Sequence, residues 1–276
     1  MSHRSGPRPH GVAALLLAAG LLLSGCAGGS GGEDGSSVPK AANDKGGNGA
    51  EGAESAGGGL GRAVPGPAVE EQTEARVVRP REIPSLGPKT RSQIPEDSRQ
   101  AVVVTGDAPD SNRAMLVLYE RDPVEGWRSV SDPWPAHNAL KGWTDDHRQG
   151  DLRSPIGVFG LTDAGGRLPD PGTELPYDRG PAFTISGVGF EGEPLAGTFD
   201  HVVAINYNRR PGTTPLDWTR PLGAGKGGGI WIHVDHGGPT QGCVSLPMGR
   251  MKELLRWLDP RMVPQVVMGD VSSLGR

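Results

Sequence analysis

The residues best suited to covalent chemistry lie near the C-terminal end of the chain, around Cys243. Cys243 is one of two cysteines in 276 residues, and it follows Gly242, which lets the backbone approach a substrate closely. A thiol with the ordinary pKa of about 8.5 is only a few per cent thiolate at pH 7, so a nucleophilic cysteine needs a base or a local positive charge. His233 and His236 are the nearest upstream bases. The alternative interpretation of Cys243 is a small buried hydrophobic residue.

The spacing of these residues favours His233 as the base. If the chain folds back about Gly238 as an antiparallel hairpin, His233 lies directly opposite Cys243. Directly paired side chains share one face, with Cβ atoms about 4.5 to 5.5 Å apart, which brings an imidazole nitrogen within reach of a thiol. His236 would instead oppose Thr240 inside the turn. We therefore expect His233, and not His236, to activate the thiol.

Short apolar runs separated by glycine- and proline-rich connections predict a mainly β fold that positions these residues. The expected strands are 101–105, 114–120, 157–161, 182–185, 201–207, 229–234 and 263–268. Alternation in the 229–234 run places three side chains on one face and three in the core: Trp231, His233 and Asp235 against Ile230, Ile232 and Val234. One amphipathic helix is expected between Pro247 and Pro260, with apolar residues at helical spacing: Met251, Leu254, Leu255 and Leu258.

The N-terminal segment is typical of an exported lipoprotein. Arg4 and Arg8 precede the apolar run 11–23, which is too short to span a bilayer as a mature helix but suits a signal peptide. The run ends in Leu23-Ser24-Gly25-Cys26, which resembles a bacterial lipobox. We expect 1–25 to be a signal peptide and Cys26 to be lipidated, which anchors the protein to the outer face of the cell membrane, facing the cell wall. A soluble secreted protein with an incidental Cys26 is the alternative.

The segment 26–98 is expected to be a disordered tether and 99–276 the catalytic domain. Thirteen glycines fall within 26–61, a composition that cannot offset its ordering entropy by apolar burial, and prolines and charges dominate up to residue 98. No aromatic residue precedes Tyr119, so only the later part can bury a sizeable core. The formal charge of −4, which becomes −6 once the basic N-terminal segment is removed, argues against a nucleic-acid partner.

Two motifs resemble the L,D-transpeptidase catalytic domain (YkuD-type) family. The first is Ile230-Trp231-Ile232-His233-Val234 followed by Pro239-Thr240-Gln241-Gly242-Cys243-Val244-Ser245, and the second is Gly150-Asp151-Leu152-Arg153-Ser154-Pro155-Ile156-Gly157. The likeness covers roughly 101–270, and the short gap between His233 and Cys243 is similar to the short-loop, actinobacterial-type branch. Two positions depart from the commonest motif: Gln241 stands where histidine is usual, and Ser245 stands where arginine or asparagine is usual.

The resemblance implies a β-sandwich of mixed sheets with one C-terminal helix, and an enzyme that acts on peptidoglycan stem peptides. It implies Cys243 as nucleophile, His233 as general base, the N–H groups of Gly242 and Cys243 as an oxyanion hole, and Thr240 as a brace for the turn. A tetrapeptide donor would acylate Cys243 and release D-alanine, and an amine of a neighbouring stem would take the acyl group. No metal or cofactor is implied, and carbapenems are expected inhibitors.

Three other interpretations of the function remain open from the sequence. Water as acceptor would make the same site an L,D-carboxypeptidase. A papain-like endopeptidase would place its histidine after the cysteine, and no histidine follows Cys243. A non-catalytic peptidoglycan-binding lipoprotein would tolerate loss of Cys243.

The pair His233 and His236 lacks the helical spacing of a metal site, and the other histidines are expected to be surface or structural residues: His137, His147 and His201.

Overall fold

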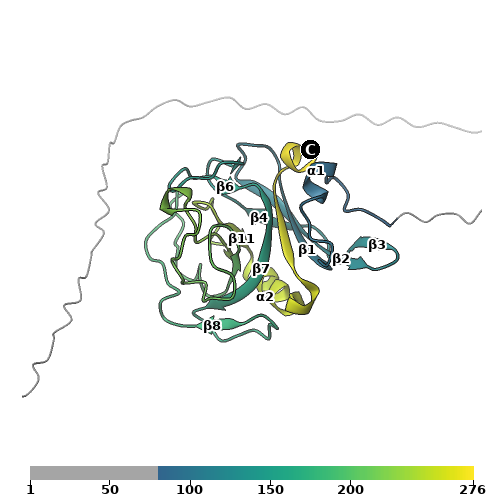
Figure 1. Cartoon of the computed structure of the whole chain (residues 1–276). Helices are drawn as coiled ribbons and strands as arrows, with labels where there is room; N and C mark the ends of the chain where they lie inside the picture. The colour runs from purple at the N-terminus through teal and green to yellow at the C-terminus, as the bar shows by residue number, and fades with distance from the viewer. Residues whose placement is uncertain (1–79) are drawn as a thin grey trace, which may run out of the picture. The chain divides into compact units, whose positions relative to one another are not determined.

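Two apolar strands from opposite ends of the folded region, β1 (Gln100–Gly106) and β12 (Gln265–Asp270), pair in parallel, with Ala101 opposite Gln265. The computed structural model describes residues 80–276 (Figure 1). In chain order, the other elements are α1 (Pro88–Arg91), β2 (Arg113–Asp122), β3 (Gly126–Ser129), β4 (Trp134–His137), β5 (Trp143–Thr144), β6 (Ser154–Pro155), β7 (Gly157–Gly166), β8 (Tyr177–Arg179), β9 (Val202–Ile205), η1 (Ala224–Lys226), β10 (Trp231–Val234), β11 (Val244–Leu246), α2 (Met248–Trp257), η2 (Pro260–Met262) and α3 (Val271–Leu274).

Most of these strands form one mixed sheet that closes on itself. The order is β1-β12-β7-β9-β10-β11-β4-β2-β3, and β2 also pairs with β1, which closes the path into a ring with β3 outside it. The pairs β1–β12, β10–β11 and β7–β8 are parallel and the others in this sheet are antiparallel, while β5 and β6 form a separate two-stranded sheet. The expectation of a mainly β, sandwich-like fold of mixed strands is confirmed.

Helix α2 packs its apolar face against the main core, as its spacing predicts. Pro247 occupies the N-cap position, and Met251, Leu254 and Leu255 are fully buried together with Leu258 at the C-cap. They belong to one apolar cluster with residues on the inner face of the sheet, including Ile230, Ile232 and Val234. The C-terminal amphipathic helix is therefore confirmed, and it packs directly beneath β10, the strand that carries His233.

One expected strand is wrong and several short ones were not expected. Residues 182–185 form turns and irregular backbone, because Phe183 is anchored by packing against Trp231 and not by a strand ladder. The unexpected strands are two to four residues long, too short to show an alternating pattern: β3, β4, β5, β6, β8 and β11. Among them, β11 directly follows Cys243.

The folded region begins before residue 99, which corrects the expected tether boundary. Ile83 and Leu86 are almost fully buried in a second apolar cluster that includes Trp127 and Val103, and α1 follows them. These few apolar side chains outweigh the proline-rich composition of the segment. The expected signal peptide, Cys26 and the tether up to residue 79 lie outside the described residues. Within residues 80–276, no helix has the length and apolar character required to cross a bilayer.

Candidate active site

Cys243 and His233 lie on neighbouring strands, but not in the antiparallel hairpin expected from the sequence. Strands β10 and β11 are parallel, with Ile232 opposite Val244 and His233 opposite Ser245. The chain between them returns to the start of β10 because Thr240 bridges to Ala139, which follows β4: Thr240 N–H donates to Asn138 O and Leu140 N–H donates to Thr240 O. This anchor replaces the hairpin turn centred on Gly238, so the expected direct pairing of His233 with Cys243 is wrong.

The side chains of His233 and Cys243 nevertheless lie on the same face of the sheet, as expected. Val244 and Leu246 point into the main core with Ile232, whereas Cys243 packs with Trp231 in a separate cluster on the other side of the sheet. In the parallel register, Cys243 continues the ladder opposite Trp231, two positions from His233 on the same face. The imidazole and the thiol therefore open into the same cavity.

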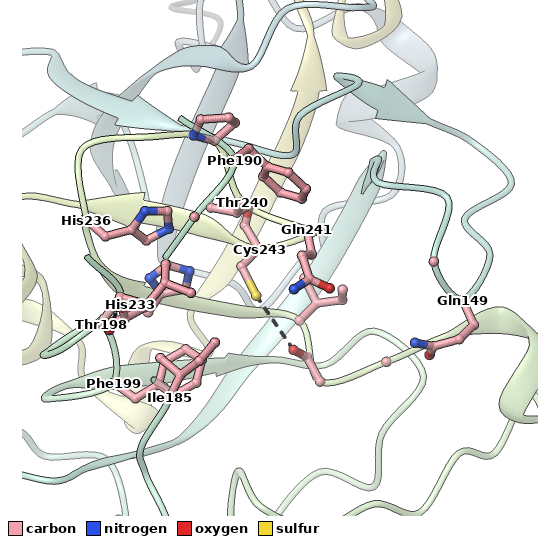
Figure 2. Close-up of a pocket in the computed structure, with 18 of the residues that line it drawn as sticks. Gln149, Ile185, Phe190, Thr198, Phe199, His233, His236, Thr240, Gln241 and Cys243 are labelled. Carbon is pink, nitrogen blue, oxygen red and sulfur yellow. Dashed lines mark hydrogen bonds between the residues drawn. The ribbon is translucent and has the colours of Figure 1, made fainter. Parts of the chain in front are cut away.

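The thiol of Cys243 is held as a neutral S–H group. Its Sγ lies 3.7 Å from Gly229 O, to which it donates (Figure 2). It also accepts from Trp231 N–H at 3.4 Å. Burial raises the pKa of Cys243 to about 11, against the smaller lowering effect of the Trp231 N–H. The nucleophile is thus stored as a thiol and must lose its proton during the reaction.

His233 has the tautomer of a general base. Its ring is buried, and Nδ1 lies 2.9 Å from the carbonyl oxygen of Val234. A carbonyl only accepts, so the proton resides on Nδ1 and Nε2 carries the lone pair. Burial lowers the pKa of His233 to about 4, which keeps the ring neutral at pH 7. Phe199 packs edge-on against the ring at 5.6 Å between centroids and fixes its plane.

The turn before β11 presents backbone donors beside the sulfur. Thr240 Oγ1 donates to Cys243 O at 2.7 Å, and Ser154 Oγ donates to the same oxygen at 3.3 Å. The N–H groups of Gly242 and Cys243 donate to no protein group within residues 80–276. Two unpaired N–H groups next to a nucleophile are the donors that an oxyanion requires.

The two positions that depart from the family motif have separate roles in the structure. Gln241 is exposed and lines the cavity. Ser245 is fully buried and donates to Asp235 Oδ1 at 2.7 Å, and His137 Nδ1 lies 2.8 Å from the same oxygen. Burial alone would raise the pKa of Asp235, but the hydrogen bonds from His137 and Ser245 lower it to about 2. Ser245 therefore stabilises the segment after β10 and does not enter the cavity.

The cavity above Cys243 has a volume of about 380 Å³, and its lining is more apolar than polar. In Figure 2, His233 and His236 lie on one side of the sulfur, and Gln241 and Gln149 lie on the other. A hairpin over residues 187–195 forms one wall: Val188 bridges to Pro194, and the hairpin adds Val188 and Phe190 to the lining. Trp218 stands at the rim with most of its surface exposed.

His147 is a site residue, although the polar sequence around it predicts a surface position. It is 6% exposed and lines the cavity, with its ring edge-on to Tyr207 at 5.3 Å between centroids. Its Cε1 would lie 3.5 Å from a Cβ at position 242, so the ring backs the nucleophile turn. The polar sequence around it gave no signal of burial, because the burial comes from the distant Tyr207 and Gly227. His201 is buried and bonds to Tyr177, as a structural histidine would.

One comparison with known proteins identifies a family for this chain. The family model of the L,D-transpeptidase catalytic domain (YkuD) matches residues 110–268, more than half of the chain, and the match includes both motifs and every cavity residue. Comparisons with curated proteins and with solved structures find no match. The matched residues run from just before β2 into β12. The chain belongs to the L,D-transpeptidase catalytic domain (YkuD) family.

Proposed function

We propose that this protein is a cell-envelope cysteine L,D-transpeptidase of the short-loop, actinobacterial type, which acts on peptidoglycan stem peptides through an acyl-enzyme at Cys243. One observation carries the proposal. A single described thiol shares a cavity with a neutral imidazole whose free Nε2 can accept its proton, and two unpaired N–H groups lie beside the sulfur. The thiol, the imidazole and the two N–H groups supply the nucleophile, the base and the oxyanion donors that acyl transfer needs, without a metal or cofactor.

In the acylation step, Nε2 of His233 takes the thiol proton as the Cys243 sulfur attacks the carbonyl carbon that precedes the terminal D-alanine. The high pKa of the thiol and the low pKa of the imidazole make complete proton transfer before attack strongly uphill, so transfer accompanies attack. The N–H groups of Gly242 and Cys243 donate to the oxyanion. The C–N bond then breaks, His233 returns the proton to the leaving amine, and a thioester remains.

In the second step, an amine of a neighbouring stem peptide attacks the thioester. His233 accepts a proton from that amine, the C–S bond breaks, and the proton passes to the sulfur to regenerate the thiol. Water in place of the amine would give carboxypeptidase activity through the same steps. Product analysis with a purified tetrapeptide donor, with and without an amine acceptor, separates the two: a cross-linked dimer supports transpeptidation, and a tripeptide alone supports hydrolysis.

A carbapenem tests the acyl-enzyme directly. Its strained carbonyl resembles the acyl donor, so the purified protein should gain the mass of one drug molecule at Cys243. Cys243→Ala should show no gain, and Thr240→Val, which removes a hydrogen bond to Cys243 O, should react more slowly but completely. Intact-mass spectrometry and peptide mapping measure the adduct. An unchanged mass after long incubation of the folded wild-type protein would contradict the proposed donor site.

The proposed location is the outer face of the cell membrane, through a lipid on Cys26. The lipobox-like sequence 23–26 and the glycine-rich segment that follows it support this placement. Replacing Cys26 with alanine should release the protein from the detergent phase or leave an uncleaved precursor. Phase partitioning and the intact mass of the purified protein measure the change. A wild-type protein that begins at an unmodified Cys26 would show that the anchor does not form.

A further inference from the structure

The hairpin 187–195 buries one carboxylate beside the active site, that of Glu193. The hairpin is closed by Gly189 N–H donating to Glu193 O at 2.8 Å and Leu195 N–H donating to Gly187 O at 3.1 Å. The Glu193 side chain is only 11% exposed, although its neighbours Glu191 and Pro194 are exposed. A carboxylate with so little contact with solvent requires partners within the protein.

Those partners are His236 and the backbone of the hairpin itself. Glu193 Oε1 lies 3.1 Å from His236 Nδ1, and Oε2 accepts from Glu191 N–H at 2.8 Å. Position 238 must be glycine for this approach, because a Cβ there would lie 2.3 Å from Oε1. Burial would raise the pKa of Glu193, but the backbone hydrogen bonds, together with His236, lower it. Glu193 is therefore an anion in the resting protein.

His236 connects this anion to the base. The rings of His236 and His233 stack with 5.9 Å between centroids and 13° between planes (Figure 2). The segment between them is held on its other side by Asp235, which bonds to His137 and Ser245. His236 therefore lies between two partners, the His233 ring that it stacks on and the Glu193 carboxylate that it bonds to.

The charges around His233 decide how easily it becomes an imidazolium. Burial lowers its pKa most, and positive charge on His236 lowers it further, whereas the charge of Asp235 raises it. Asp235 is already paired with His137, and the neighbouring Cys243 thiol is neutral. Glu193 is the remaining carboxylate on the His236 side, supplied by the hairpin. Its charge offsets the cost of a proton on the His233 ring.

We propose that Glu193 is a positioning residue for the reaction: through His236 it fixes the stacked imidazole against His233, and its carboxylate favours the His233 imidazolium that forms as Cys243 attacks. The base is then fully effective only while the hairpin lies over the cavity. This inference rests on the proposed function in that His233 activates Cys243, but it does not depend on the identity of the acyl acceptor.

The test compares Glu193→Gln with Glu191→Gln. The first keeps the shape and a hydrogen-bonding oxygen beside His236 but removes the charge, and the second removes a charge from the same hairpin at a side chain that does not bond to His236. The second-order rate constant for carbapenem acylation of Cys243 should fall about tenfold in Glu193→Gln and stay unchanged in Glu191→Gln. Circular dichroism and thermal unfolding should be the same in both variants.

A pH profile separates this role from a purely structural one. Removing a negative charge lowers the pKa of His233, so the acidic limb of the acylation profile should move to lower pH in Glu193→Gln while the plateau falls. Three results would each overturn the proposal. They are a lower plateau rate in Glu193→Gln without movement of the acidic limb, an equal loss of acylation rate in Glu191→Gln, and an unchanged acylation rate in Glu193→Gln.

Alkylation of Cys243 by iodoacetamide is measured over the same pH range, because it reports the base without requiring an acyl donor. If carbapenem fails to acylate the wild type while alkylation is slowed in Glu193→Gln with a shifted limb, the proposed function fails and the positioning role of Glu193 stands. Equal alkylation profiles in the wild type and Glu193→Gln would overturn the role of Glu193 alone.

Discussion

Replacing His233 with alanine should reduce acylation of Cys243 by about a thousandfold, in the range expected for loss of a general base. The thiol donates to Gly229 O at rest and has a pKa raised to about 11 by burial, so at pH 7 almost none of it is thiolate. Only a base with a free nitrogen in the same cavity can remove the proton during attack, and Nε2 of His233 meets that requirement. The rate of carbapenem adduct formation measures the loss.

His236→Ala is the matched control for this prediction. Its ring lies in the same cavity and stacks on His233, but its Nδ1 is bonded to Glu193, so its loss should leave roughly a tenth of the rate. Thiol alkylation at neutral pH should follow the same ranking. If folded His233→Ala keeps the rate and folded His236→Ala loses it, then His236 is the base.

The pH dependence of thiol alkylation should also differ between these variants. In the wild type, His233 assists at neutral pH, and the assistance is lost as pH falls through its lowered pKa of about 4. In His233→Ala, alkylation should be very slow at pH 7 and rise towards pH 11, because only the free thiolate reacts. A profile in His233→Ala that is flat between pH 6 and 9 and equal to that of the wild type would contradict base assistance.

The sequence predicts which residues meet at this site better than it predicts how the strands bring them together. Alternation in 229–234 places His233 on the correct face, because side chains on a strand alternate whichever neighbour the strand pairs with. The direction in which β10 and β11 pair cannot be predicted in this way. It depends on the bridge between Thr240 and Ala139, about a hundred residues apart along the chain, and nothing local in 237–239 distinguishes a returning loop from a hairpin. The prediction that His233 is a cavity residue is therefore correct, although the register from which it follows is wrong.

Long-range packing also explains what the sequence did not reveal. His147 lies in a polar segment, yet Tyr207 and the glycine-rich segment around Gly227 bury it beside Gly242. Ile83 and Leu86 lie in a proline-rich segment, yet Trp127 buries them. The helix α2 and the long strands β1, β2 and β12 were predictable because each carries its own apolar pattern. Glu193 gave no local signal, since its role depends on a contact with His236.

Replacing Asp163 with alanine should lower the free energy of unfolding by about 3 to 5 kcal/mol, the range for breaking a buried ion pair by removing one partner. Asp163 Oδ2 lies 2.8 Å from Arg209 Nη1, and both side chains are at most 5% exposed. The same oxygen accepts from Gly212 N–H and from Thr162 Oγ1. The variant leaves the Arg209 charge buried without its counter-ion. Urea unfolding followed by tryptophan fluorescence measures the change.

The control is Asp107→Ala, which breaks the exposed pair with Arg113 at 3.8 Å and should change stability little. The double variant Asp163→Leu with Arg209→Met should recover much of the loss, because no unpaired charge then remains buried. Asp163 links β7 to the loop after β9, and that loop leads to Gly229, which holds the Cys243 thiol. Asp163→Ala should therefore also alter alkylation of Cys243 below its unfolding transition. Stability equal to that of Asp107→Ala would show that the buried pair does not hold this loop.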